Sequence, residues 1–247
     1  MPAYFKIIST NILLSSCLIS LLYTMEISEL SYSGIDFKVK KNGFSNVSYI
    51  LLHGDEETAR MLLSEHIKGN KGRAFFIKSK EREVLLGSTM VDPNRIFSRS
   101  GAKKALKKFK PNWDPKELDK LLTELDNSRN IFLFNLFPSE GGLLIALHNN
   151  FRGYNVKDEI NNSQSHSIKK DQNPRDFIIC TDLKDYKKLE QGPYNVVLQN
   201  IMEKNNNGSL SWAALDNGVR YINIETRLGW LSQQRKMLKF VETSLRK

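Results

Sequence analysis

Short apolar runs bounded by polar or turn-forming residues recur along most of the chain. They predict strands at residues 47–52, 73–78, 83–86, 131–135, 143–147, 177–180, 195–198 and 221–224. Between them, patterns typical of helices occupy residues 57–63, 115–125 and 229–245. Strands that alternate with helices indicate an α/β layered domain, and 247 residues suit one such domain better than two.

The first part of the chain has a different pattern. After Lys6, residues 7–23 carry no charge, which is typical of a secretory signal or of an uncleaved membrane anchor. A buried first helix remains an alternative, and so does lipidation at Cys17, although the apolar run continues past that cysteine. We therefore expect residues 1–24 to be a signal peptide or anchor, and residues 25–247 to form a domain that is periplasmic or faces the cell surface.

Cysteine content and charge narrow the function classes. Without residues 1–24 only Cys180 remains, which excludes an internal disulfide and a Cys/Cys metal site. The net charge is +10, and the densest basic run covers residues 103–110. Such a run attracts anionic polymers, for example the cell wall or a lipid surface, or forms a solvated helix face. Export argues against a nucleic-acid partner.

The chain has four histidines, and two of them end predicted strands. His53 stands three positions before Glu56 at a strand-to-helix corner, and His148 ends the run 143–147. Side chains at i and i+3 in a first helical turn converge on one point, and two histidines with one glutamate are an established ligand set for catalytic zinc. These three residues predict a Zn²⁺ site, although each of them alone also fits a structural role.

Two further segments extend this hypothesis. Asp92, Pro93, Asn94 and Arg95 lie between the two ligand segments, and the strand predicted at 221–224 is followed by Glu225. A zinc hydrolase needs a base that takes a proton from water and returns it to the leaving amine, which Glu225 would supply if it reaches the metal.

The ordered set resembles the zinc carboxypeptidase superfamily, including its aspartoacylase and succinylglutamate desuccinylase branch. That superfamily has a His-x-x-Glu pair after a strand, an Asp-x-Asn-Arg segment, a third histidine ligand and a strand ending in the catalytic glutamate. The resemblance spans about residues 47–230 on few identities. Pro93 replaces the usual leucine, and Asn149 replaces the usual small hydroxyl residue after the third ligand.

The resemblance implies a phosphorylase/hydrolase-like mixed sheet of about eight strands, helices on both faces and one zinc. Asn94 and Arg95 would hold a free carboxylate of the substrate, because a guanidinium binds a carboxylate with two parallel hydrogen bonds. Tyr154 is a candidate substrate-capping phenol. The second arginine of the family is not evident, since Arg73, Lys78, Lys80 and Arg82 are all in range.

Together these patterns predict a zinc-dependent hydrolase that cleaves an amide or peptide bond near a free carboxylate, for example in cell-wall peptides. Two alternatives stay open: an N-acyl amino acid deacylase of aspartoacylase type, and a non-catalytic membrane-tethered binding protein. The segments 151–154 and 208–211 and residue Asp182 also look site-facing.

Overall fold

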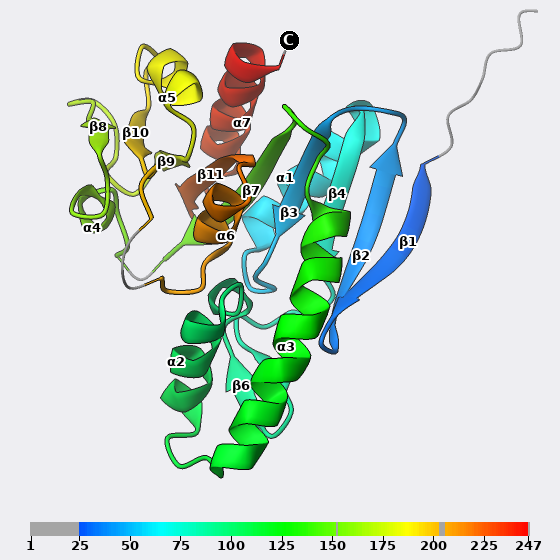
Figure 1. Cartoon of the computed structure of the whole chain (residues 1–247). Helices are drawn as coiled ribbons and strands as arrows, with labels where there is room; N and C mark the ends of the chain where they lie inside the picture. The colour runs from blue at the N-terminus through cyan, green and yellow to red at the C-terminus, as the bar shows by residue number, and fades with distance from the viewer. Residues whose placement is uncertain (1–24, 152, 203–205, 247) are drawn as a thin grey trace, which may run out of the picture.

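One mixed sheet of nine strands organises the chain, as the computed structural model shows (Figure 1). The structure describes residues 25–151, 153–202 and 206–246. The strand order is β1-β2-β4-β3-β7-β11-β9-β10-β8, with parallel pairing from β4 through β3 and β7 to β11. The pairs outside this block are antiparallel, except for β9 and β10, which are parallel to each other. Its strands are β1 (Glu26–Tyr32), β2 (Ile35–Asn42), β3 (Val47–Leu51), β4 (Gly72–Ile77), β7 (Leu143–Asn150), β8 (Ser165–Ser167), β9 (Phe177–Cys180), β10 (Asn195–Leu198) and β11 (Arg220–Arg227).

Helices cover both faces of this sheet. One face packs on α2 (Arg99–Phe109), α3 (Pro115–Leu136) and α6 (Leu210–Asp216), and the other on α1 (Glu57–Gly69), α5 (Leu183–Leu189) and α7 (Leu231–Leu245). The remaining elements are the hairpin of β5 (Val84–Leu86) and β6 (Thr89–Val91), the 3-10 turn η1 (Pro93–Arg95) and the short helix α4 (Lys157–Ile160). The expected single α/β domain with helices on both faces is confirmed.

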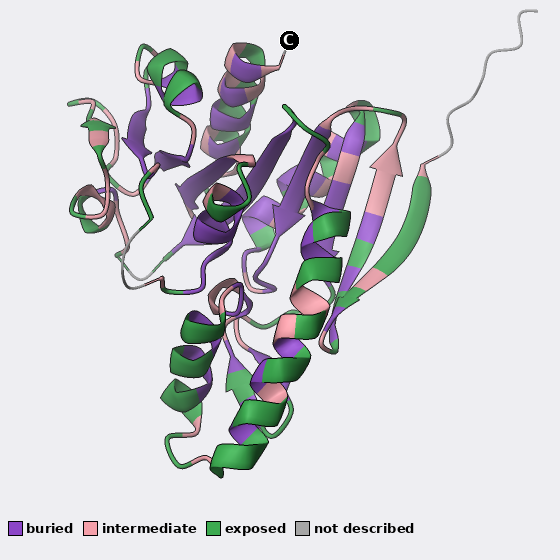
Figure 2. Cartoon of the chain, in the orientation of Figure 1, coloured by how far each residue is buried: buried purple, intermediate pink, exposed green. Residues whose placement is uncertain are grey.

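The central strands explain why two cores form. Every residue of β3 is buried, and alternate side chains point to opposite faces, with Tyr49 and Leu51 in one core and Ile50 in the other. Parallel strands that are covered on both faces are expected to be apolar without a break. Figure 2 shows this as a buried centre, with exposure concentrated on β1 and on the outer faces of the helices.

Two expectations about secondary structure were wrong. Residues 131–135, predicted as a strand, lie in the last part of α3. Asp114 caps α3 as expected, with its carboxylate accepting from the backbone nitrogens of Lys116 and Glu117, and the helix then runs to Leu136 because nothing breaks it. The pattern analysis also missed the β1–β2 hairpin, so the sheet has nine strands rather than about eight.

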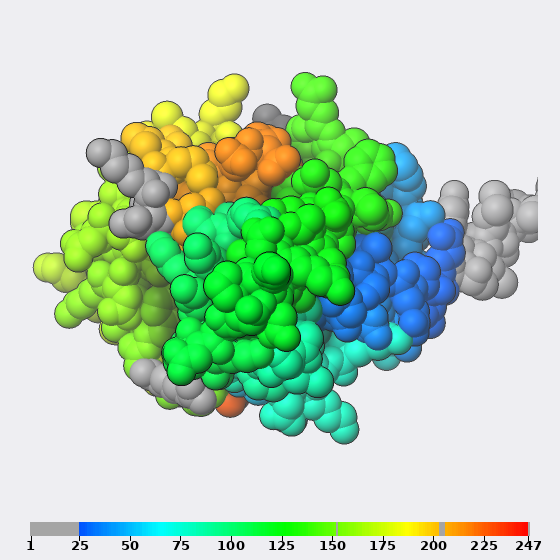
Figure 3. Space-filling view, turned by 60° about the horizontal axis from the view of Figure 1, so that its bottom comes forward, coloured from blue at the N-terminus to red at the C-terminus, as the bar shows by residue number. Residues whose placement is uncertain are grey.

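The basic run 103–110 falls largely on α2. Ala102, Ala105 and Leu106 are buried beneath it, while the lysines between them face solvent. Figure 3 views this end of the molecule, where α2 and α3 come forward together. The run is thus a solvated helix face, and binding of an anionic polymer to it stays a prediction.

In the described ranges, from residue 25 to 246 with gaps at 152 and 203–205, no helix has the length and apolar character needed to cross a bilayer. The expected signal or anchor, with Cys17, lies outside the described residues.

Candidate metal centre

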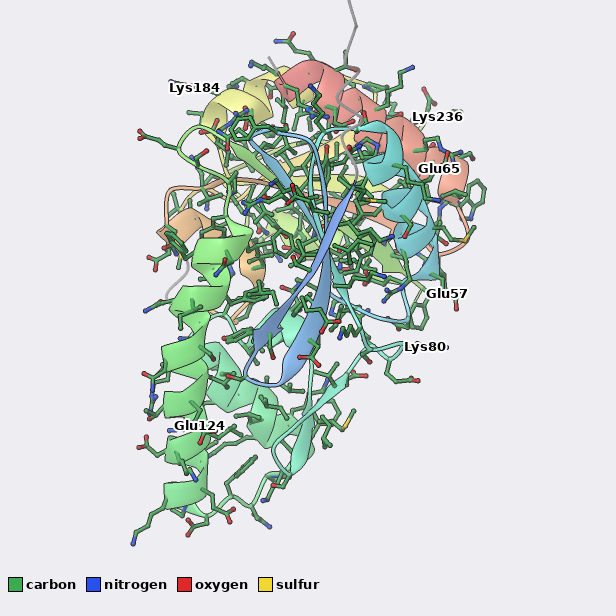
Figure 4. All side chains as sticks on the ribbon, turned by 90° about the vertical axis from the view of Figure 1, so that its right-hand side faces the viewer. Glu57, Glu65, Lys80, Glu124, Lys184 and Lys236 are labelled. Atoms are coloured by element: carbon green, nitrogen blue, oxygen red, sulfur yellow. The ribbon has the colours of Figure 1, made fainter. Side chains whose placement is uncertain are left out.

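His53 and Glu56 are placed by a sharp corner between β3 and α1. Gly54 lies so close to the segment after β4 that a Cβ at this position would sit 2.4 Å from the carbonyl oxygen of Ser79. Its backbone nitrogen donates to the carbonyl of Glu81 at 2.9 Å. Figure 4 shows this neighbourhood from the side, with Lys80 near the start of α1. Only glycine permits such an approach, so the corner is locked between two loops.

Glu56 stands at the N-cap of α1 without capping it. Its carboxylate makes no hydrogen bond to the helix, and Oδ1 of Asn149 accepts from the backbone nitrogen of Ala59 instead, at 2.8 Å. The carboxylate is therefore free to turn toward the histidines. Asn149, which follows His148 on β7, thus supplies the acceptor at the start of α1 that Glu56 does not supply.

The three predicted ligands meet in one buried cluster. Oε1 of Glu56 lies 2.8 Å from Nδ1 of His53 and 3.2 Å from Nδ1 of His148. All three side chains are at most 3% exposed, and their donor atoms lie within 4.8 Å of one another. Ligand atoms about 2.0–2.1 Å from a tetrahedral zinc are separated by about 3.4 Å, which is close to these spacings. This is the convergence that the sequence predicted.

Unpaired buried atoms test whether the cluster suits a cation. Oε2 of Glu56 and Nε2 of His148 are buried and make no hydrogen bond to any described residue. Oε2 of Glu56 lies 3.1 Å from Nδ1 of His148 without a hydrogen bond to it. Buried polar atoms are nearly always hydrogen-bonded in folded proteins, so each of these two atoms has the capacity for an additional partner. Nitrogen and carboxylate ligands of this kind suit zinc. The residues therefore fit a divalent metal.

The electrostatics of the cluster also favour a bound cation. Burial alone would raise the pKa of Glu56, but the charges of His148 and His53 lower it to about 2. Burial alone would lower the pKa of His53, but Glu56 and Asp92 outweigh it and raise that pKa to about 9. The carboxylates thus hold a positive charge at this point, which a metal ion would replace.

Asp92 holds the far side of His53, which the sequence analysis did not assign. Oδ1 of Asp92 lies 2.8 Å from Nε2 of His53 and also accepts from the backbone nitrogen of Asn94 at 2.8 Å. Burial alone would raise the pKa of Asp92, but the hydrogen bond and charge of His53 lower it below its ordinary range. A carboxylate on the second nitrogen fixes the ring of a metal-binding histidine and makes it more basic.

Glu225 stands beside the cluster because β7 and β11 are parallel and in register. His148 on β7 pairs with Glu225 on β11, so both side chains leave the sheet on the same face. Asn223 donates to one oxygen of Glu225 at 3.2 Å, and Asn150 donates to the other at 3.4 Å. Burial and the charge of Glu56 raise the pKa of Glu225, while His148 opposes them. A raised pKa makes a carboxylate a stronger base, as a group that accepts a proton from water needs to be.

These residues open onto a cavity of about 300 Å³. The predicted substrate-binding residues Asn94, Arg95 and Tyr154 all line it, and so do Ser209 and Ser211 of the segment that looked site-facing. Oδ1 of Asn94 accepts from the backbone nitrogen of Leu210 at 2.9 Å, so this side chain also ties η1 to the start of α6. The hydroxyl of Tyr154 donates to Glu159 on α4.

The structure also distinguishes between the basic residues that the sequence left open. Arg82 lines the cavity and lies 3.3 Å from Glu56, whereas Arg73 donates to backbone carbonyls near the end of α3. Arg73 lies near the start of β4 and Arg82 follows the end of that strand, so the two residues stand at opposite ends of β4. Lys78 pairs with Glu29 on the surface.

Asp182 does not belong to the site. It caps α5 with its carboxylate, which accepts from the backbone nitrogen of Asp185 at 2.8 Å. The residue follows β9, and β9 runs antiparallel to β11, so the end of β9 lies at the edge opposite to Glu225.

Comparison with known proteins gives only distant similarity. No family model and no curated protein sequence matches the chain. Among solved structures, the ectoine utilization protein EutE (DoeB) from Ruegeria pomeroyi is 15% identical in its apo form. The match covers 89% of this chain and 65% of that one, with a TM-score of 0.46. Its product-bound form is 13% identical, and that match covers 85% of this chain and 60% of that one, with a TM-score of 0.42.

A provisionally assigned metallopeptidase from Shewanella denitrificans OS217 is 11% identical over 90% of this chain and 85% of that one, with a TM-score of 0.44. The chain spans less than two thirds of the length of EutE. Similarity at this level assigns neither a family nor an activity to the chain.

Proposed function

We propose that the chain is a zinc-dependent hydrolase that cleaves an amide bond next to a free carboxylate. The observation that carries the proposal is the buried convergence of His53, Glu56 and His148, with Glu225 beside them on the adjacent strand. A cluster built only for stability would not leave two buried polar atoms of its own members without a hydrogen bond.

His53, Glu56 and His148 would hold the metal. When bound there, zinc activates water at neutral pH and polarises the carbonyl of the substrate. Asp92 keeps the ring of His53 in its ligating orientation.

Glu225 serves as the base in this proposal. Its carboxylate takes a proton from the attacking water and returns it to the departing nitrogen. Asn150 and Asn223 hold the two oxygens, so the carboxylate keeps its direction during both transfers. Arg175 in turn holds Asn150 through its side-chain oxygen at 2.9 Å and its carbonyl at 2.7 Å.

Arg95 and Arg82 serve substrate positioning. Arg95 grips the free carboxylate and so fixes which amide meets the reacting groups. Arg82 lies next to Glu56 in the cavity wall, where its guanidinium would stabilise the negative charge that develops on the carbonyl oxygen.

The size of the cavity favours a small substrate. A volume of about 300 Å³ is at the lower end for ligand pockets, which fits an acylated amino acid or the last residues of a peptide. A deacylase for N-acyl amino acids is therefore the second candidate function, and an enzyme that cleaves the end of a cell-wall peptide remains the first.

We also propose that this activity lies outside the cytoplasm, because residues 7–23 carry no charge, as is typical of a secretory signal or a membrane anchor.

The experiment compares N-acetyl amino acids and short peptides with the same compounds whose carboxylate is blocked as a carboxamide, using the zinc-loaded chain. We expect hydrolysis of the free acids and a loss of about 10- to 100-fold in kcat/KM for the carboxamides. Arg95→Met should abolish this discrimination, while the exposed Arg235→Met should keep it. Absence of any zinc-dependent turnover would favour the non-catalytic binding protein, and equal turnover of both compounds would remove Arg95 from carboxylate binding.

A further inference from the structure

The charged groups on the cavity wall differ in how far they are already paired. Arg82 lies 3.3 Å from Glu56 and 3.9 Å from Asp55, so its charge is shared with two carboxylates. Nη1 of Arg95 donates to the backbone carbonyl of Asn94 at 2.7 Å, and no carboxylate of the described residues forms an ion pair with it within 4.0 Å. Arg95 is thus a cation with its charge available to a ligand.

Glu159 is the opposite case. The Tyr154 hydroxyl donates to Oε1, and Nε2 of Gln199 donates to Oε2. Both donors are neutral, and within residues 25–151, 153–202 and 206–246 no lysine, arginine or histidine pairs with this carboxylate within 4.0 Å. Two neutral hydrogen bonds hold the group in place but leave its charge uncompensated.

Tyr154 links this anion to the reacting groups. Its ring packs edge-on against Phe177 at 5.4 Å between centroids, which fixes the phenol between α4 and the sheet. The phenol feels the charges of Glu225 and Arg95 as well as that of Glu159. Glu159 therefore lines the same cavity as Tyr154, the proposed base Glu225 and the carboxylate-binding Arg95.

We propose that the substrate carries a protonated amine in addition to its carboxylate, and that Glu159 receives the amine. The inference rests on the proposed function for the identity of the reaction, but not for the recognition of charge. A fixed carboxylate and a fixed guanidinium on one small cavity wall are complementary to a zwitterion. A substrate that lacks the amine leaves the charge of Glu159 without a cationic partner in the cavity wall, and a polar pocket discriminates against analogues that leave its groups unpaired.

Two substrate pairs that differ only by a terminal amine test this on the zinc-loaded full chain. Nα-acetyl-lysine against Nα-acetyl-norleucine places the amine on the leaving side, and 6-aminohexanoyl-alanine against hexanoyl-alanine places it on the acyl side. We expect the cationic member of at least one pair to have a kcat/KM about 10- to 100-fold higher, as for a charge-assisted hydrogen bond. Glu159→Gln should abolish that ratio, and Glu57→Gln, which removes an exposed charge, should keep it.

A second variant separates charge recognition from positioning of the phenol. Tyr154→Phe removes the hydrogen bond to Glu159 and leaves the negative charge. If Glu159 acts on the substrate directly, this variant changes turnover of both members of a pair in the same proportion. If Glu159 only orients Tyr154, the variant loses the preference as Glu159→Gln does, and the proposal is overturned.

Binding gives a readout that does not need turnover. Calorimetry on the zinc-loaded chain uses 6-aminohexanoate and hexanoate, which have no α-amine and no amide bond. It should show at least tenfold tighter binding of 6-aminohexanoate to the wild-type chain and no difference in Glu159→Gln. If no amide is cleaved and 6-aminohexanoate is still preferred, the proposed hydrolysis fails and this inference stands. If amides are cleaved without preference in either pair and 6-aminohexanoate binds no tighter than hexanoate, the inference fails alone.

Discussion

At the scale of single residues, neighbouring groups hold each side chain of the site in place. Glu56 is withheld from capping its own helix, His53 is held from behind by Asp92, and Glu225 is held by two asparagines. A merely structural polar cluster would pair these groups with one another in full. This pattern fits the metal centre and the hydrolase that we propose.

Replacement of Glu225 separates metal binding from turnover. Glu225→Gln should keep zinc, because the carboxylate is not one of the converging ligands, and should lower kcat about 10²- to 10⁴-fold, since an amide side chain accepts no proton from water. Glu57→Gln on the surface of α1 is the matched control and should keep full activity. Steady-state kinetics with a zinc assay on the same samples checks both statements, and unchanged kcat would remove Glu225 from the reaction.

Replacement of Asp92 tests positioning of a ligand. Asp92→Asn still offers an oxygen to the backbone of Asn94 but no longer carries the negative charge beside His53. We expect zinc affinity to fall about 10- to 100-fold with little change in the folded structure. Competition with a chelator measures the affinity; an unchanged dissociation constant would show that Asp92 has no influence on the ligand.

The sequence was most informative about residues that end strands and least informative about their supports. His53, His148 and Glu225 were predicted because each of them directly follows an apolar run that reads as a strand. Asn150 and Asn223 were not predicted, although each stands two positions from His148 or Glu225 on the same strand and therefore on the same face. Asp92 and Arg82 were within the segments considered, but their contacts cross between loops, and nothing local in the sequence specifies such contacts.

At the scale of elements, parallel register brings the site together, and strand direction decides what is left out. Asp182 ends a strand just as Glu225 does, yet its strand runs the other way, so it lies at the far edge. Residues 131–135 show a second limit, since a run of four apolar residues fits a strand as well as the buried and exposed faces of a long helix. Only the cap at Asp114 and the absence of a breaker identify the helix.

Glu242 joins three elements at the far end of the domain and gives a test of stability against pH. From α7 it accepts from Tyr49 on β3, His66 on α1 and Arg246. Burial alone would raise its pKa, but these partners lower it below the ordinary value of 4.5. A carboxylate with a lowered pKa stabilises the fold above the unfolded pKa, and this contribution is lost as pH falls through the folded one.

We therefore expect Glu242→Gln to lower the free energy of unfolding by about 1–3 kcal/mol at pH 7. The difference from wild type should shrink as the pH is lowered below about 4.5, since the wild-type carboxyl then becomes neutral too. Urea unfolding at a series of pH values measures this. Glu65→Gln, which removes an exposed pair with Arg235, should cost less than about 1 kcal/mol, and a pH-independent effect of Glu242→Gln would contradict the explanation.

At the scale of the whole molecule, the metal should couple to folding because its ligands come from two distant parts of the chain. His53 and Glu56 lie at the corner between β3 and α1, and His148 lies on β7, so binding requires the assembled sheet. A ligand at a thousand times its dissociation constant adds about 4 kcal/mol to stability. For a domain of this size we expect the Tm to rise by about 8–16 °C when zinc is added to the chelated chain. A Tm that does not depend on zinc would show that the cluster does not bind the metal in the folded state.

The most direct test of the account is the zinc content of the purified chain. The wild-type protein should hold one zinc per chain after dialysis, and His148→Ala should hold almost none while keeping its circular dichroism spectrum. His166→Ala, which changes a histidine on β8 away from the cluster, should keep the full content. One zinc per chain in both wild type and His148→Ala would contradict the proposed metal centre, and with it the hydrolase built around it.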